Sequence, residues 1–211
     1  MTAKMNMSAR LVEALARPKT RVVFYGTSLT KSGGWVEVIA DELGRRYPGI
    51  TCINAACDGQ NSRWGLEQFE SRVLAQSPDV LFIEFAMNDA VARFAISLSD
   101  AQANLEAMLD RLAARRPQCV VVLQVMNPVI DRPHGHDGYR PELYSYEQIY
   151  RSVAKARRLT LIDHAPAWAA LLVRGETLFR HYVPDGLHPS PSSYEKFVLP
   201  TLRETLALRA R

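Results

Sequence analysis

The sequence contains little of what marks a disulfide-rich, metal-binding or membrane-spanning protein. Its three cysteines, Cys52, Cys57 and Cys119, are an odd number without the spacing of a metal site. We interpret them as reduced, small apolar residues of the core, which fits a reducing compartment. No apolar run approaches the roughly 20 residues of a membrane-spanning helix, and residues 1–17 lack the continuous apolar segment of a signal peptide. A cytoplasmic protein without a membrane span is therefore expected, with export by another route left open.

A strong excess of charge is also missing. Lys and Arg number 26 against 22 Asp and Glu, which gives a net charge of +4. The densest basic stretch, residues 151–158, falls within a predicted helix, and no stripe of aromatic and basic side chains accompanies it. Such a stretch is more typical of a solvated helix face than of a nucleic-acid patch. The sequence therefore predicts no nucleic-acid partner.

A metal site has one weak candidate, His134 and His136 beside Asp137. Two histidines without another evident ligand are more typical of a solvated loop. We therefore predict no metal and no cofactor. Nothing in the sequence indicates an oligomeric state.

Apolar runs of strand length alternate with stretches of helical periodicity along the 211 residues. The predicted strands are residues 21–25, 50–54, 79–85, 118–125 and 159–163. The predicted helices run from 35 to just before Pro48, over 63–75, from 99 past 112, over 142–158 and over 192–208. Alternation of this kind implies a parallel sheet covered by helices on both faces. We expect a single domain over residues 1–211, without internal repeats or linkers.

Chemically useful residues follow three of these strands. Ser28, Gly59 and Asn88 come after the first, second and third strand. Ligands of such sheets bind beyond the carboxyl ends of the strands, so these residues are expected at one rim. Further along, Asp185 lies three residues before His188 in a stretch punctuated by proline and glycine, so one turn can hold the carboxylate against a ring nitrogen. A serine hydroxyl facing the other ring nitrogen would complete an activated oxygen nucleophile.

Two other arrangements are less convincing. Asp163 and His164 are adjacent rather than one turn apart, so we rank them below Asp185 and His188. A Gly-x-Ser-x-Gly elbow is absent because Thr30 stands at the last glycine position. That absence argues against the α/β-hydrolase fold.

Four short segments carry these residues in order. They are Gly26-Thr27-Ser28-Leu29, residues 54–59, Ala86-Met87-Asn88-Asp89 and Asp185-Gly186-Leu187-His188. Together they resemble the sequence blocks of the SGNH hydrolases, also called the GDSL esterase/lipase superfamily. The superfamily usually has aspartate at the position of Thr27 and glycine at that of Ala86, whereas the last block matches in full.

The resemblance implies an α/β fold of the flavodoxin-like type, a three-layer α/β/α sandwich with a five-stranded parallel sheet. It also implies a serine esterase with Ser28, His188 and Asp185 as catalytic residues. The backbone N–H groups of Ser28 and Gly59 and the side-chain amide of Asn88 would form the oxyanion hole. The expected substrate is a small or medium acyl ester, including O-acetylated carbohydrate. An acyl-CoA-type thioesterase and a catalytically weak carbohydrate- or lipid-binding module are the alternatives left open.

Other residues near these segments have structural explanations. We expect Trp35 to pack in the core and Asp89 to hold its loop through backbone N–H groups. Residues 126–146 contain a long polar loop, which favours a role in binding. Arg132 and Arg140 in this loop are candidate anchors for an anionic or sugar substrate.

Overall fold

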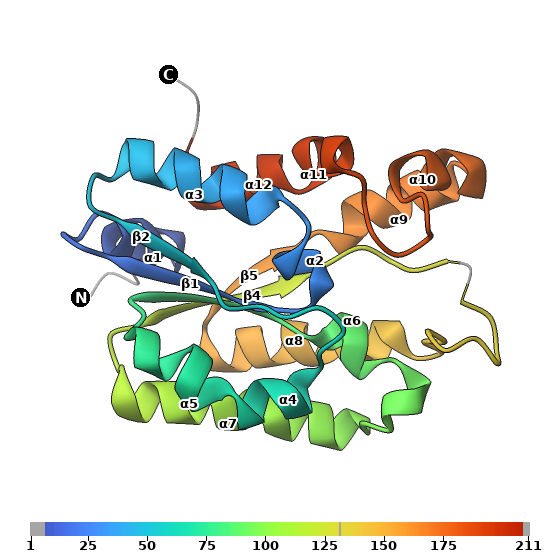
Figure 1. The fold of residues 1–211 in the computed structure, drawn as a ribbon, viewed down its shortest axis with the longest axis horizontal. Coiled ribbons are helices and arrows are strands. Elements are labelled where there is room, and N and C mark those ends of the chain that lie inside the picture. The colour runs from blue at the N-terminus through green and yellow to red at the C-terminus, as the bar shows by residue number, and fades with distance from the viewer. Residues whose placement is uncertain (1–6, 131, 209–211) are drawn as a thin grey trace.

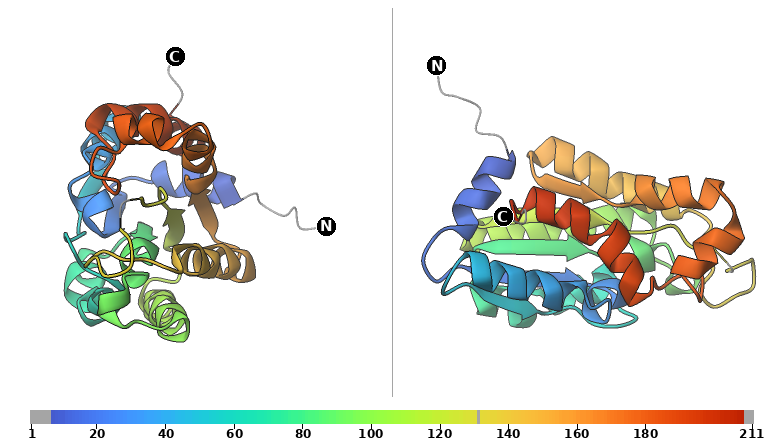
Figure 2. Two further views of the ribbon diagram at one scale, coloured as in Figure 1. Left: turned by 90° about the vertical axis from the view of Figure 1, so that its right-hand side faces the viewer. Right: turned by 90° about the horizontal axis from the view of Figure 1, so that it is seen from above.

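Five parallel strands form the central sheet of the computed structural model, which describes residues 7–130 and 132–208 (Figure 1). The strands are β1 (Arg21–Gly26), β2 (Thr51–Asn54), β3 (Val80–Glu84), β4 (Val120–Val125) and β5 (Thr160–Asp163), in the order β2-β1-β3-β4-β5. Helices cover both faces of the sheet, and the three layers are seen clearly in Figure 2. The predicted flavodoxin-like α/β/α architecture is confirmed.

The three middle strands, β1, β3 and β4, are buried almost throughout, whereas β2 and β5 at the edges are partly exposed. Burial on both faces explains why the middle strands are nearly continuous apolar runs. Because side chains alternate along a strand, Phe24 and Phe82 pack with one helical layer, and Val23 and Leu81 pack with the other. The Phe24 and Phe82 rings stack with centroids 4.8 Å apart.

Each face has its own set of helices. One face is covered by α1 (Met7–Leu15), α3 (Trp35–Arg46), α9 (Ala165–Val173), α10 (Glu176–Tyr182), α11 (Pro191–Phe197) and α12 (Leu199–Thr205). The other is covered by α4 (Ser62–Glu67), α5 (Phe69–Arg72), η1 (Leu74–Gln76), α7 (Leu98–Arg115) and α8 (Leu143–Arg157). The predicted core position of Trp35 is confirmed, since its side chain is fully buried against Phe24.

The helices differ from the prediction in several places. The single helix expected over 63–75 is divided into α4, α5 and η1, with breaks at Gln68 and Val73. The helix expected over 192–208 is divided at Val198, because Pro200 lies in the first turn of α12. Helix α7 begins at Leu98, one residue earlier than expected, and is capped by Ser97 and Asp100.

Helices α1, α9 and α10 were not predicted, and neither were the short helices α2 (Ser28–Lys31), α6 (Ala86–Asp89) and η2 (Ala92–Phe94). Helix α9 is apolar at almost every position, so it lacks the helical periodicity by which an amphipathic helix is recognised. The prediction for the cysteines holds in part, since Cys52 packs against one core cluster and Cys119 against the other, whereas Cys57 belongs to neither. Cys52, Cys57 and Cys119 are free thiols that are only partly buried.

Candidate active site

The residues expected at one rim follow the carboxyl ends of the strands. Ser28 opens the short helix α2 (Ser28–Lys31) after β1, and Asn88 lies in α6 (Ala86–Asp89) after β3. Gly59 lies in the loop after β2 and has a φ of 71°, a conformation that favours glycine. These three residues line one cavity of about 620 Å³ together with His188. The expected convergence at the sheet edge is therefore present in the structure.

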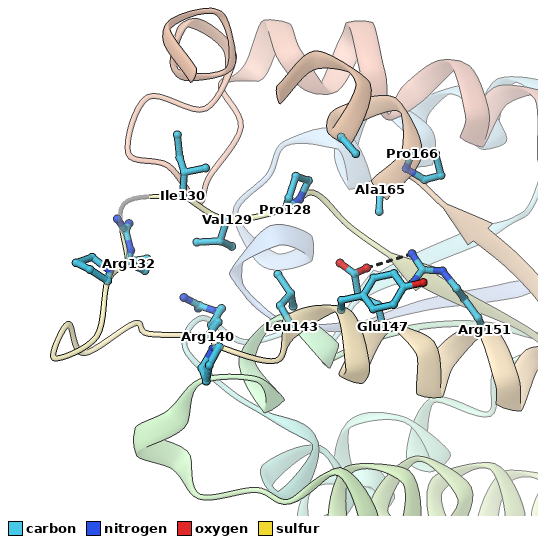
Figure 3. Close-up of a pocket in the computed structure, with 14 residues that line it drawn as sticks. Pro128, Val129, Ile130, Arg132, Arg140, Leu143, Glu147, Arg151, Ala165 and Pro166 are labelled. Carbon is cyan, nitrogen blue, oxygen red and sulfur yellow. Dashed lines mark hydrogen bonds and ion pairs between the residues drawn. The ribbon is translucent and has the colours of Figure 1, made fainter. Parts of the chain in front are cut away.

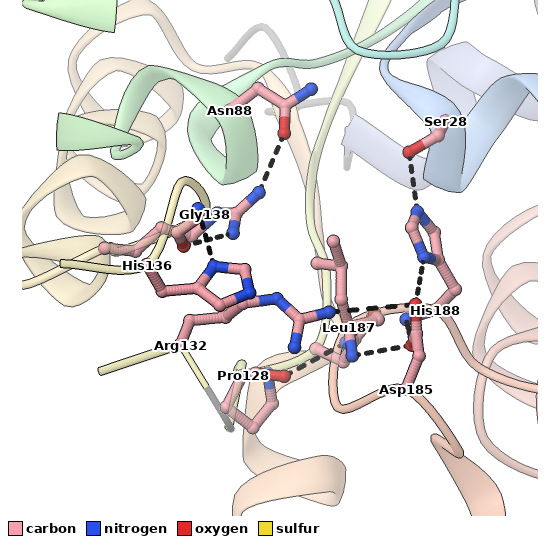
Figure 4. Close-up of polar contacts among 11 residues, drawn as sticks. Ser28, Asn88, Pro128, Arg132, His136, Gly138, Asp185, Leu187 and His188 are labelled. Atoms are coloured by element: carbon pink, nitrogen blue, oxygen red, sulfur yellow. Dashed lines mark hydrogen bonds and ion pairs between the residues drawn. The ribbon is translucent and has the colours of Figure 1, made fainter. Parts of the chain in front are cut away.

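A line of hydrogen bonds joins three of the predicted side chains (Figure 4). The Ser28 hydroxyl lies 2.9 Å from His188 Nε2, and His188 Nδ1 lies 2.7 Å from Asp185 Oδ2. The other carboxylate oxygen, Oδ1, accepts from the backbone N–H groups of Leu187 at 2.9 Å and His188 at 2.7 Å. One tight turn thus fixes both the acid and the ring, so that the imidazole can exchange a proton with the hydroxyl.

The Asp185 carboxylate is held in its charged form. Partial burial acts to raise its pKa, but the hydrogen bonds from the His188 ring and from the two backbone amides outweigh that effect and lower the pKa. The side chains of Asp185 and His188 are 50% and 45% exposed. An ionised carboxylate beside the ring favours a proton on Nδ1, which leaves Nε2 able to accept one.

Glu84, a buried carboxylate at the end of β3, holds the loop that carries Ser28 through hydrogen bonds. Its Oε1 atom accepts hydrogen bonds from the Thr27 backbone N–H at 2.7 Å, the Thr27 hydroxyl at 2.8 Å and the Thr30 hydroxyl at 2.8 Å. Burial raises the pKa of Glu84 to about 7. Gly26 is required beside it, because a Cβ there would lie 2.5 Å from Glu84 atoms.

This contact explains the threonine at position 27, where the sequence blocks that this chain resembles usually have aspartate. The Thr27 side chain is fully buried and points to Glu84, so it anchors the loop. Sequence reasoning missed Glu84, although a signal was present. It is the only charged residue in an otherwise apolar strand, β3.

The Asn88 side chain is fixed at both ends of its amide. Its Nδ2 donates to the Gln60 carbonyl at 2.8 Å, and its Oδ1 accepts from Arg140 Nη2 at 3.1 Å. Beside it, Asp89 accepts from the Ser62 backbone N–H at 2.7 Å, as the predicted loop-holding role requires. Burial raises the pKa of Asp89 to about 7.

The loop between β4 and α8 lies over the exposed part of this site. The Ile130 backbone N–H donates to the Gly186 carbonyl at 3.0 Å, and Asn127 Nδ2 donates to the Leu187 carbonyl at 2.8 Å. These bonds attach the loop to the turn that carries His188. In the same loop, Arg132 Nη2 lies 3.8 Å from Asp185 Oδ2.

A second cavity, of about 810 Å³, adjoins the first, because Arg132 and Arg140 line both (Figure 3). Its other walls are mostly apolar and come from the β4–α8 loop, α8 and α9. They include Pro128, Val129, Ile130, Leu143, Ala165, Pro166 and Ala169. Arg132 and Arg140 thus belong to the walls of both cavities.

The other candidate groups do not take part in the line of hydrogen bonds from Ser28 to Asp185. Asp163 forms an ion pair with Arg151 at 2.7 Å. The His164 ring is buried, and this burial lowers its pKa to about 4. His136 Nδ1 accepts from the Gly138 backbone N–H at 2.8 Å. Over residues 7–130 and 132–208, no group of three or more His, Cys, Asp or Glu side chains could hold a metal ion.

The basic stretch 151–158 forms the C-terminal end of α8. Arg151 contacts Glu147 and Asp163, and Arg157 contacts Glu106 and Asp110. Much of its charge is therefore paired with carboxylates. None of the helices in the described part of the chain is long and apolar enough to cross a membrane.

Comparisons with known proteins point to one family. Residues 22–196 match the GDSL-like lipase/acylhydrolase family. An acetylxylan esterase of Geobacillus stearothermophilus is 23% identical over 206 residues, which cover 87% of this chain and 93% of that protein. The solved structure of Axe2, an acetylxylan esterase of the same organism, has a TM-score of 0.75 at 19% identity and covers 93% of this chain and 99% of its own. A GDSL-like lipase of Bacteroides thetaiotaomicron has a TM-score of 0.69 at 22% identity, with 96% and 97% covered.

Proposed function

The chain belongs to the GDSL-like lipase/acylhydrolase family and is an ester hydrolase, and from that premise we propose that it is a serine esterase with Ser28 as its nucleophile. Its substrates are small or medium acyl esters, with O-acetylated carbohydrate as the leading class. The observation that carries the proposal is the line of hydrogen bonds from the Ser28 hydroxyl through the His188 ring to the Asp185 carboxylate.

The proposed reaction forms an acyl-enzyme. Ser28 Oγ attacks the ester carbonyl carbon while His188 Nε2 takes the hydroxyl proton. The same ring then gives this proton to the departing alcohol, and a water molecule later releases the acyl group by the same two steps. Asp185 holds the proton on Nδ1 and stabilises the imidazolium that forms in each step.

The tetrahedral intermediate carries a negative oxygen that needs hydrogen-bond donors. We assign this role to the backbone N–H groups of Ser28 and Gly59 and to the amide of Asn88, all three of which line the cavity. A neutral amide suits the third position, because it donates a hydrogen bond without a charge that would retain the substrate or the product. Donors of this kind each contribute about 10²–10³ to turnover.

The relatives support both the residues and the substrate class. Variants of Axe2 described as catalytic mutants replace a serine, an aspartate and a histidine by alanine, and the last two are three positions apart. Asp185 and His188 have the same spacing. Axe2 is an acetylxylan esterase, which favours acetylated carbohydrate as the first substrate to test.

Labelling by a fluorophosphonate tests the nucleophile. Wild type and the control Ser71→Ala, at an exposed serine in α5, should both be labelled, whereas Ser28→Ala should not. Absence of label on folded wild type would contradict the esterase and favour a binding module. Hydrolysis of nitrophenyl acetate, longer nitrophenyl esters, acetylated xylan and acetyl-CoA then ranks the substrates. A clear preference for acetyl-CoA would favour the thioesterase.

A further inference from the structure

Arg140 reaches the cavity from the β4–α8 loop and is tied to the segment that carries Asn88. Its Nε donates to the Met87 carbonyl at 2.7 Å, Nη2 donates to Asn88 Oδ1 at 3.1 Å, and Nη1 donates to the Gly138 carbonyl at 2.7 Å. The side chain is partly buried. Burial, together with Arg132 and Arg93 nearby, lowers its pKa to about 10, so the guanidinium stays charged at neutral pH. The guanidinium thus binds both the backbone carbonyl of Met87 and the side chain of Asn88.

This contact decides which way the Asn88 amide faces. An amide presents an acceptor oxygen at one end and a donor nitrogen at the other, and either could in principle occupy a given place. A guanidinium has no acceptor, so only the amide oxygen can lie against Arg140. The Gln60 carbonyl has no donor, so only Nδ2 can lie against it. Nδ2 has two hydrogens, of which Gln60 takes one, and the second is left to donate to an oxyanion.

We propose that Arg140 is a positioning residue for the oxyanion hole and acts through Asn88. It fixes the amide in the donor orientation, and its charge draws electron density toward Asn88 Oδ1, which makes the N–H a stronger donor. The inference depends on the proposed esterase function. It gives Arg140 a different role from that of a substrate anchor.

The same contacts allow a simpler explanation, in which Arg140 only holds the loop in place. The two explanations differ in what they predict for kinetics. A loop anchor that fails would weaken substrate binding and stability. A residue that acts through Asn88 contributes in the transition state, so its loss lowers kcat and leaves KM nearly unchanged. It also has nothing left to contribute once Asn88 has been removed.

The test is a double-mutant cycle with Arg140→Met and Asn88→Ala, measured on nitrophenyl acetate. Arg140→Met should lower kcat about 10- to 100-fold in the wild-type background and less than about twofold in the Asn88→Ala background. Affinity for phenylboronic acid, which forms a tetrahedral anion on reactive serines, should fall in parallel with kcat. The matched control is Arg116→Met. The Arg116 guanidinium also binds one backbone carbonyl, that of Pro78, and one side chain, that of Asp79, but it does so near the opposite ends of the strands. This control should keep wild-type kcat.

Two further measurements keep the proposal open to contradiction if Arg140→Met is poorly folded. Arg140→Lys retains the charge but not the planar guanidinium with its several N–H donors, and its kcat should lie between those of wild type and Arg140→Met. Ethylguanidinium added to Arg140→Ala should restore part of kcat. Equal losses from Arg140→Met in both backgrounds, or a change confined to KM, would overturn the positioning role. Full activity of Ser28→Ala would instead overturn the esterase proposal itself.

Discussion

The two halves of the candidate site are held in place by opposite means. Ser28 and Asn88 follow buried strands, and carboxylates inside the protein, Glu84 and Asp89, fix their loops. Burial raises the pKa of both acids. Asp185 and His188 are half exposed, and hydrogen bonds within their own turn lower the pKa of Asp185. The buried half is therefore held by the protein interior, while the exposed half keeps an ionised acid beside the ring that we propose exchanges protons.

The largest effect is expected from the exposed half. Asp185→Asn keeps the size of the side chain but removes the charge that holds the proton on His188 Nδ1. We expect kcat on nitrophenyl acetate to fall about 10³–10⁴-fold with little change in stability. Asp41→Asn, at an exposed carboxylate of α3 that does not line the cavity, is the control for loss of one carboxylate. A tenfold loss or less in Asp185→Asn would show that the ring needs no carboxylate partner.

The next effect concerns the buried half. Asn88→Ala removes the proposed side-chain donor and should lower kcat about 10²–10³-fold while KM changes little. The comparison with Asp185→Asn is informative, because Asn88→Ala affects stabilisation of the oxyanion, whereas Asp185→Asn affects proton transfer by His188. Turnover close to that of wild type would contradict the assignment of Asn88 to the oxyanion hole.

The sequence is informative where function or burial imposes a local pattern. The strands were predictable because burial on both faces requires continuous apolar runs, as in β1 and β4. The Asp185 and His188 pair was predictable because one turn brings residues three positions apart together. The positions of Ser28 and Asn88 at the sheet edge were predictable because each lies within four residues of a strand end.

Contacts between distant parts of the chain could not be predicted from local sequence patterns. Arg140 and Asn88 are 52 positions apart, and an irregular loop brings them into contact. Such a loop has no repeating sequence pattern from which its course could be predicted. Helix α9 was missed because its residues are apolar on all sides. Glu84 is an intermediate case, since a lone carboxylate in an apolar strand signals a buried partner but does not identify Thr27 and Thr30.

A third prediction tests whether the buried half depends on Glu84. Glu84→Ala leaves three buried donors, from Thr27 and Thr30, without their acceptor. We expect the free energy of unfolding to fall by about 3 kcal/mol, measured by urea denaturation. The control is Glu70→Ala, which removes an exposed carboxylate of α5 paired with Arg115 and should cost about 1 kcal/mol or less. Similar losses in the two variants would mean that Glu84 is not a special support.

The last prediction is a dependence of stability on pH. The pKa of Glu84 rises from 4.5 to about 7 on folding, and that of Asp89 rises from 3.8 to about 7. Between the pKa values of the unfolded and the folded chain, the folded chain binds more protons at both sites. The free energy of unfolding therefore falls as pH rises from about 4 to about 7. Asp185, whose pKa is lowered, acts in the opposite sense, and its contribution is lost only as the pH falls below about 4.

Glu84→Gln separates this contribution from that of the other acids, because glutamine resembles the protonated carboxyl and does not ionise. Its Oε1 can still accept from Thr27 and Thr30. We expect the urea midpoint of Glu84→Gln to be similar to or slightly below that of wild type at pH 5 and to exceed it at pH 8, where wild type bears the cost of a buried charge. The control Glu70→Gln, at an exposed acid, should show no such change of its urea midpoint relative to wild type between pH 5 and pH 8. If the two curves for wild type and Glu84→Gln stay parallel from pH 5 to pH 8, Glu84 does not titrate in this range, and the buried half is held by a carboxylate that is ionised throughout.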